Sequence, residues 1–247
     1  METAGLIKAL VREGQLLATA ASEAGPEAAV PTCPGWNVRD LLRHTGTVHR
    51  WATAFVNEGH TSFHPGAGEP DLDGDELLEW FREGHGLLVA ALSEAPADVE
   101  CWTFLPAPSP LAFWARRQAH ETSIHRADAE SALAGKPGTV AAAFAADGID
   151  ELLCAFHARP KSRVRTKEVR ILRVRAIDTD DVWTVRLSTE PAQTERTEEG
   201  PADCELSGTA EQLYLALWNR LPLTAASVTG DAELAQLWRE QSAITWS

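Results

Sequence analysis

The sequence has no long hydrophobic run. None of its 247 residues falls in a window that approaches 18 consecutive apolar positions, so a transmembrane helix is not expected. The start of the chain, Met1-Glu-Thr-Ala-Gly5, lacks the basic and apolar segments of a secretory signal peptide. Positive charge is also scarce, and the formal net charge of −14 argues against binding to nucleic acid or to an anionic membrane surface. We therefore expect a cytoplasmic protein.

Cysteines are few and scattered. The four of them, Cys33, Cys101, Cys154 and Cys204, form no C-x-x-C pair, which excludes a zinc ribbon and a thioredoxin-like redox motif. We expect reduced, mostly buried thiols, as in a cytosolic protein. Cys33 lies in a Pro- and Gly-rich turn beside Trp36, where packing of the tryptophan is a simpler role than nucleophilic catalysis.

The first part of the chain is patterned as a helical bundle. Apolar residues recur at helical spacing, Asn37 is placed to cap the second helix with Asp40 at its third position, and Gly135 and Pro137 follow the fourth. The segment 57–74 is rich in Gly, Pro, His and Asp and is interpreted as a long loop. The expected helices are 3–24, 37–57, 75–94, 111–130 and 139–157.

The periodicity changes after Pro160. Residues 169–177 and 182–187 alternate between apolar and polar positions around an Asp-rich turn, which predicts a β-hairpin. The chain then predicts short strands at 204–208 and 226–230 and helices at 209–219 and 231–242. The expected fold class is α+β, mostly α. A helical bundle over 1–159 is followed by a small α+β domain over 160–247.

Three residues of the bundle form a candidate metal site. Glu121 and His125 are four residues apart, so they lie on one face of a helix and can bind one ion together. A third ligand must come from another helix. On the second helix, His49 has the phase of the apolar face, whereas His44 lies about 140° away and is expected to face solvent. The pattern therefore favours His49, and it excludes His120, which points about 100° away from Glu121.

Each of these residues also has a simpler interpretation. A lone histidine on an apolar face is more often a hydrogen-bonded core residue than a ligand. An acid and a histidine at this spacing are also common surface neighbours. Asp128 is as compatible with an ordinary helix charge as with a partner of a ligand histidine.

The donor set decides what such a site would do. Imidazole nitrogens and a carboxylate suit zinc, iron or nickel, and zinc is the usual ion in a site with three protein ligands. The open coordination position could hold water or the thiolate of a substrate, because a zinc-bound thiol is deprotonated at neutral pH.

Several segments occur in an order and at spacings that are characteristic of one protein family. They are Pro31-Thr-Cys-Pro-Gly-Trp-Asn-Val-Arg-Asp-Leu-Leu-Arg-His44, Val48-His-Arg-Trp51, Trp114-Ala-Arg-Arg-Gln-Ala-His-Glu-Thr-Ser-Ile-His-Arg-Ala-Asp-Ala-Glu130 and, near the C-terminus, Leu206–Arg220 with Val228-Thr-Gly-Asp231 and Trp238. Together they closely resemble the mycothiol-dependent maleylpyruvate isomerase family. The resemblance covers most of the chain and implies a DinB-like metal-binding four-helix bundle followed by the family's C-terminal domain.

The resemblance also implies a chemistry. In the family, zinc is held by a histidine of the second helix and a Glu-x-x-x-His pair of the fourth, which we match to His49, Glu121 and His125. The implied cofactors are Zn²⁺ and mycothiol, whose thiolate would add to an electrophile such as maleylpyruvate. Elimination after rotation about the resulting single bond would give fumarylpyruvate. No protein nucleophile is required.

Contacts to the thiol or substrate are expected from Arg82, Asn219 and Arg220, whose simpler roles are capping, ion pairing and solvation. Arg117 and Arg126 are further candidates for a carboxylate. The expected partners are a small-molecule thiol and a small electrophile, and the oligomeric state is open between monomer and homodimer. Two rival functions remain, a hydrolase that uses zinc-bound water and a non-catalytic binding protein of the same fold.

Overall fold

The computed structural model describes residues 1–133 and 138–244, which form two compact units, Met1–Gly138 and Thr139–Ser247. The first unit is a helical bundle and the second combines a five-stranded sheet with helices. The expected fold class, mostly α with a small α+β part, is confirmed. None of the helices in the described part of the chain is long and apolar enough to span a membrane.

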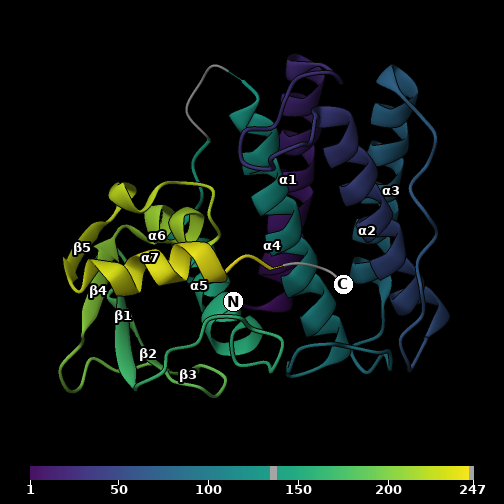
Figure 1. The fold of residues 1–247 in the computed structure, drawn as a ribbon. Helices are drawn as coiled ribbons and strands as arrows, with labels where there is room; N and C mark the ends of the chain where they lie inside the picture. Colours follow the sequence, from purple (N-terminus) through teal and green to yellow (C-terminus); the bar gives the residue numbers. More distant parts are fainter. Residues whose placement is uncertain (134–137, 245–247) are drawn as a thin grey trace. The chain divides into compact units, whose positions relative to one another are not determined.

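Four long helices build the first unit, and Figure 1 shows them side by side. Their bounds are α1 Thr3–Ala24, α2 Val38–Glu58, α3 Gly74–Glu94 and α4 Pro110–Ser131. The helix α1 packs mainly against α4, and α2 packs against α3. Contacts of α1 with α3 and of α2 with α4 close the bundle. Fully buried side chains such as Leu10, Leu41, Phe55, Phe81 and Trp114 fill its interior.

Local sequence signals set the helix ends. Asn37 caps α2 with a capping box: its side chain accepts from the Asp40 amide at 3.1 Å, and the Asp40 carboxylate accepts from the Asn37 amide at 2.9 Å. Gly59, in the left-handed conformation with φ of 65°, ends the same helix. Ser109 caps α4, and Pro110 occupies the first turn.

The loop expected near 57–74 is present as residues 59–73, which we call the strap. It runs back along α2 and is held there by several hydrogen bonds. The Trp51 indole donates to the His64 carbonyl at 2.7 Å, and the Arg43 guanidinium donates to the Leu72 carbonyl at 2.6 Å. The strap is therefore anchored near both ends of the helix.

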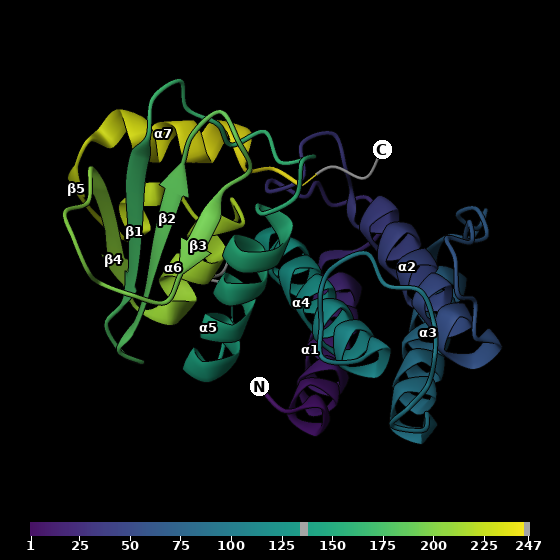
Figure 2. The same ribbon diagram turned by 90° about the horizontal axis from the view of Figure 1, so that it is seen from below.

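The second unit is built on a mixed sheet with the strand order β3-β2-β1-β4-β5 (Figure 2). Its elements are α5 Ala142–Asp150, the π-helix η1 Glu151–Phe156, β1 Arg170–Ala176, β2 Asp181–Leu187, β3 Gln193–Glu195, β4 Cys204–Gly208, α6 Ala210–Leu217, the 3₁₀ turn η2 Leu223–Ala225, β5 Ser227–Gly230 and α7 Ala232–Gln241. The predicted hairpin is confirmed, because β1 pairs antiparallel with β2. The strand β4 pairs parallel with β1, and β3 was not predicted from the sequence.

The two faces of this sheet differ in polarity. Along β1, Leu172 and Val174 are fully buried, and α6 packs on the sheet with Thr209 as its N-cap. The alternate positions Arg173 and Arg175 lie on the other face, where Arg175 pairs with Glu205 at 3.1 Å. The alternation read from the sequence is thus an alternation of polarity between the two faces. Burial does not follow it at Arg173, which is 8% exposed and donates to the Gly200 carbonyl at 2.8 Å.

The boundary between the two units lies earlier than expected. Residues 139–159 were assigned to the first domain, but α5 packs against α6, and the Trp183 indole of β2 donates to Asp150 at 3.1 Å. The expected boundary at 159/160 therefore falls inside the second unit. The change of periodicity at Pro160 marks where helix gives way to strand, whereas the packing of the apolar α5 decides to which unit it belongs.

His157, which follows η1, is a buried histidine in the second unit. Its ring lies edge-on to Trp238 at 4.6 Å, and its Nδ1 is 2.9 Å from the Ser162 hydroxyl. Burial, with the charges of Arg159 and Arg165, lowers the pKa of His157 to about 3. The folded state therefore holds this side chain neutral.

We predict that the second unit loses stability as the pH falls from about 6.5, the pKa of an unfolded histidine, towards 3. In this window the unfolded chain binds a proton at His157 that the folded chain does not. The free energy of unfolding therefore decreases as the pH decreases. In His157→Gln this part of the slope, at most about 1.4 kcal/mol per pH unit, should vanish. Hydrogen exchange of the β1 and β2 amides measures it, and equal slopes in both proteins would contradict the prediction.

Candidate metal centre

The α4 helix places Glu121 and His125 one turn apart, as the sequence predicted. The His125 Nε2 atom lies 3.3 Å from the Glu121 Oε1 atom. Both side chains are largely buried, with 8% of His125 and 7% of Glu121 exposed. The carboxylate and the imidazole therefore present their donor atoms to the same small volume.

The residue of α2 that lies beside this pair is His44. Its Nε2 atom lies 3.6 Å from the same Glu121 oxygen, and the ligand atoms of His44, Glu121 and His125 all lie within 4.8 Å of one another. Two imidazole nitrogens and one carboxylate oxygen at this spacing suit a zinc-like ion. The residues present thus fit the type of metal that the resemblance implies.

The structure brings His44, rather than the predicted His49, to the Glu121/His125 pair. His49 points into the core, as its helical phase predicted, but its Nε2 lies 2.9 Å from the Thr122 hydroxyl and its ring packs near Phe81 and His85. The expectation that His44 faces solvent is wrong, because only 22% of its side chain is exposed. The helix α2 contacts both α3 and α4. Its most apolar face is therefore not the face that lies next to Glu121.

A tryptophan borders the three donors. The Trp36 ring lies edge-on to the His44 ring at 5.1 Å and stacks on the His125 ring at 6.4 Å. Trp36 belongs to the turn before α2. Thr32 of the same turn donates a hydrogen bond to Asp128 of α4. The partial exposure of His44 leaves one side of the group accessible, as a catalytic site requires and a closed structural site does not.

Asp128 fixes the orientation of His125. Its Oδ2 atom lies 2.9 Å from His125 Nδ1, and its Oδ1 accepts a hydrogen bond from the Thr32 hydroxyl at 2.6 Å. The side chain of Asp128 is fully buried. A carboxylate on Nδ1 keeps the proton there and leaves Nε2 facing Glu121, which is the usual arrangement behind a ligand histidine. Of the two roles open from the sequence, the geometry favours this one.

The electrostatics of Glu121 favour its charged form. Burial opposes ionisation, but hydrogen bonds from His125 and His44 and the positive charges of His125 and Arg117 outweigh it. These interactions hold the pKa of Glu121 well below its usual range. The Arg117 Nη2 atom donates to the second carboxylate oxygen at 3.2 Å. One oxygen of Glu121 is thus fixed by arginine, while the other faces the histidines.

His125 shows the opposite shift. Burial disfavours its charged form, but hydrogen bonds to Asp128 and Glu121, together with their negative charges, raise the pKa of His125 to about 9. Two carboxylates around one imidazole create a position that attracts a cation. A metal ion bound there would replace the proton on the Nε2 side.

The other candidates in the bundle have structural contacts. Arg117 and Arg126 are each 1% exposed, and Arg126 pairs with Glu13 at 3.1 Å, so neither presents a guanidinium to a substrate at the surface. His120 is fully buried and lies outside the group of three donors. Arg82 is exposed on α3 and pairs with Glu79. The i,i+4 spacing of Arg117 and Glu121 was visible in the sequence and could have revealed this contact.

The remaining candidates lie elsewhere. Asn219 has a left-handed backbone with φ of 65° after α6, and its side chain donates to the Arg239 carbonyl at 3.2 Å. Arg220 donates to the Trp218 carbonyl at 2.8 Å. None of the four cysteines forms a disulfide, and Cys33 is partly exposed in its turn.

Comparisons with known proteins agree with this architecture. The model of the mycothiol maleylpyruvate isomerase N-terminal domain matches residues 7–130, and the model of the corresponding C-terminal domain matches residues 143–237. Two solved structures of a mycothiol-dependent maleylpyruvate isomerase, one of them an H52A mutant, are 13% and 12% identical to this chain. Each covers 93% of both chains, with TM-scores of 0.61 and 0.63. No protein of curated function matches the sequence.

We predict that His44→Ala binds zinc at least about tenfold more weakly than the unmodified protein, because it removes one of three donors. His49→Ala should keep its zinc affinity within a few-fold, although the loss of a buried group lowers its stability. Competition with a chelating dye measures both affinities, and thermal unfolding reports the stability. The reverse order of affinities would restore His49 as the ligand.

Proposed function

The chain belongs to the mycothiol maleylpyruvate isomerase family, and from this premise we propose that it is a metal-dependent enzyme that uses mycothiol as a thiol cosubstrate. Its second substrate would be a small unsaturated electrophile similar to maleylpyruvate. The observation that carries the proposal is the convergence of His44, Glu121 and His125 within the domain that the family model matches. Zinc is the ion that this donor set suits best.

A divalent ion at this position would stabilise a thiolate at neutral pH and polarise a carbonyl group. The double bond of the electrophile would gain the sulfur, rotate as a single bond and form again when the sulfur leaves. The thiol is regenerated, so the net reaction is an isomerisation.

The residues of the chain hold the geometry for this chemistry. Asp128 keeps the proton of His125 on Nδ1, and Arg117 fixes the outer oxygen of Glu121. Trp36 covers one side of both histidine rings, which restricts their rotation and keeps water away from that side. The three donors are therefore oriented before any ligand arrives, which lowers the cost of binding.

The thiol would come from outside the chain. The group of donors in the described residues contains no cysteine, and two of the four thiols, Cys101 and Cys204, are buried with pKa values raised by burial. Neither of these two is poised as a nucleophile. This favours an external thiol over a protein nucleophile.

Arg220 belongs to the second unit, where its guanidinium donates to the Trp218 carbonyl. Its expected contact with the thiol or the substrate stays a prediction. Asn219 contacts the end of α7 and Arg82 pairs with Glu79 at the surface, so the proposal does not include them.

We predict that zinc-loaded protein converts maleylpyruvate only when mycothiol is present. Asp128→Asn should lower the zinc affinity about 10- to 100-fold, because His125 loses the carboxylate that sets its proton. Absorbance of the product measures turnover, and a chelator competition measures affinity. Asp75→Asn, a change of the same kind on the exposed face of α3, is the matched control and should alter neither.

Cys33→Ser should also keep full activity. Turnover without any thiol would replace this proposal by hydrolysis through metal-bound water. Loss of activity in Cys33→Ser with an unchanged circular dichroism spectrum would restore a protein nucleophile.

A further inference from the structure

The strap covers a cavity in the first unit. None of the three candidate metal donors lines it. It has a volume of about 190 Å³ and lies between the strap and the outer side of α2. Its lining is Thr47, Arg50, Trp51, Ala54, Phe55 and Glu58 of α2, Trp80 of α3, and His60 and residues 64–68 of the strap. Pockets for drug-sized molecules are typically ~300–1,000 Å³, so this one has room for about one ring.

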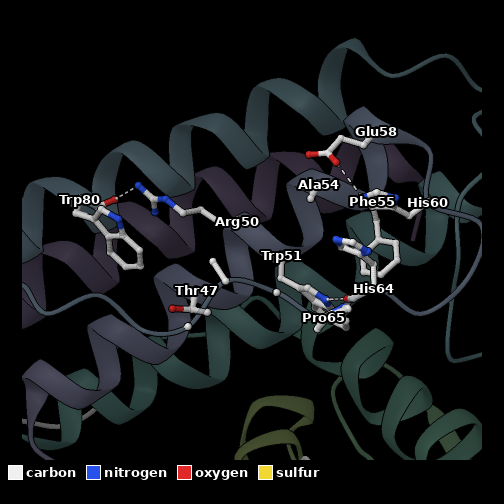
Figure 3. A pocket seen from close by; sticks show the side chains of 13 residues that line it. Thr47, Arg50, Trp51, Ala54, Phe55, Glu58, His60, His64, Pro65 and Trp80 are labelled. Atoms are coloured by element: carbon white, nitrogen blue, oxygen red, sulfur yellow. Dashed lines mark hydrogen bonds and ion pairs between the residues drawn. The ribbon is translucent and has the colours of Figure 1, made fainter.

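Aromatic groups form the walls of the cavity. Figure 3 shows Trp80 and Arg50 at one end, His60 and His64 at the other, and Thr47 and Trp51 between them. The His60 and His64 rings stack at 4.1 Å, and the Trp51 indole is fixed by its bond to the His64 carbonyl. Flat aromatic walls suit a ligand whose ring presents C–H bonds to their faces.

The ionisable groups at the two ends are already paired, although the Arg50 Nη1 atom and the His60 Nε2 atom have no hydrogen-bond partner in the described part of the chain. The Arg50 guanidinium lies 3.9 Å above the Trp80 ring and pairs with Glu83 at 2.9 Å, and Glu58 pairs with His60 at 2.9 Å. An anionic ligand would have to compete with Glu83, and a cation with His60. The cavity therefore favours a neutral ligand over an ion.

The same cavity offers hydrogen bonds to such a ligand. The Thr47 hydroxyl is screened from solvent and has no hydrogen-bond partner in the described part of the chain. A buried hydroxyl without a partner is costly, and a hydroxyl of a ligand would satisfy it. Apolar walls with a few polar groups at the edges are the chemistry of a site for a polyhydroxylated ring.

We propose that this cavity binds a neutral polyhydroxylated ring, a sugar or cyclitol, and that the ring is one end of the thiol cosubstrate. The assignment of this ring to the thiol cosubstrate rests on the proposed function. Thr47 and Trp51 lie about 60° and 20° from His44 around the axis of α2, and Trp51 is roughly 10 Å further along it. A thiol cosubstrate that carries such a ring would lie along this stripe with its sulfur at His44.

Binding of the ring is tested with free myo-inositol. We expect the indole N–H signal of Trp51 to shift on titration, with a Kd on the order of 1 mM, as befits a ligand of this size. Thr47→Val should weaken binding about fivefold or more, and Ala54→Phe should abolish it by filling the cavity. Thr53→Val, on the same helix but outside the lining, is the matched control and should bind normally. No shift, or tighter binding of benzoate than of inositol, overturns the assignment.

The link to the thiol is tested separately. In the zinc-loaded enzyme, Thr47→Val should raise the KM for mycothiol several-fold and leave kcat unchanged, whereas Thr53→Val should change neither. An unchanged KM, with inositol binding lost, overturns the link. The inositol titration needs no turnover, so a failure of the proposed function would leave the Trp51 shift intact, whereas a failure of this inference would abolish it.

Discussion

The first unit depends on the pairing of charged side chains along α4. This helix is buried on most of its surface, yet a large part of what it buries is polar: Arg117, Gln118, His120, Glu121, Thr122, Ser123, His125, Arg126 and Asp128. Removing one partner of a buried ion pair costs about 3–5 kcal/mol, because the other charge stays behind in a poor solvent. A helix of this kind is stable only if each charge meets its partner, and that requirement fixes how the other helices pack around it.

The partners come from several elements of the unit. Glu13 of α1 meets Arg126, His44 of α2 meets Glu121, and Thr32 of the preceding turn meets Asp128. Two carboxylates, Asp128 and Glu121, face His125, and their hydrogen bonds and negative charges raise the pKa of this imidazole to about 9 despite its burial. The same arrangement that stabilises a proton there is suited to a metal ion. Under the proposed function, stability and metal affinity would depend on one set of contacts, and a change to Asp128 would affect both.

Much of this could be predicted from the sequence. The helices, the hairpin, the capping box at Asn37 and the Glu121/His125 pair all follow from local rules of spacing. The choice between His44 and His49 did not, because helical phase identifies the most buried face. The three candidate donors lie at the edge of that face, where His44 is still partly exposed.

Other features depended on packing between distant segments. The role of α5 as part of the second unit is decided by its contact with α6, which no local pattern encodes. The Thr32–Asp128 bond joins residues 96 positions apart in the chain, and β3 is only three residues long. A spacing rule finds neither.

The wall of the cavity under the strap depends on two glycines that local propensity would disfavour. A Cβ atom on Gly46 of α2 would lie 2.2 Å from the Trp80 ring, and one on Gly84 of α3 would lie 1.9 Å from the Arg50 guanidinium. Glycine in a helix interior costs about 0.5–1 kcal/mol relative to alanine, so its presence at both points needs a compensating contact. That contact is the approach of the Trp80 indole and the Arg50 guanidinium to the helix backbones, which lets them stack on each other at 3.9 Å. The α2–α3 interface thus contains two glycines that are unfavourable in a helix. Their missing side chains leave the space that Trp80 and Arg50 occupy at one end of the cavity.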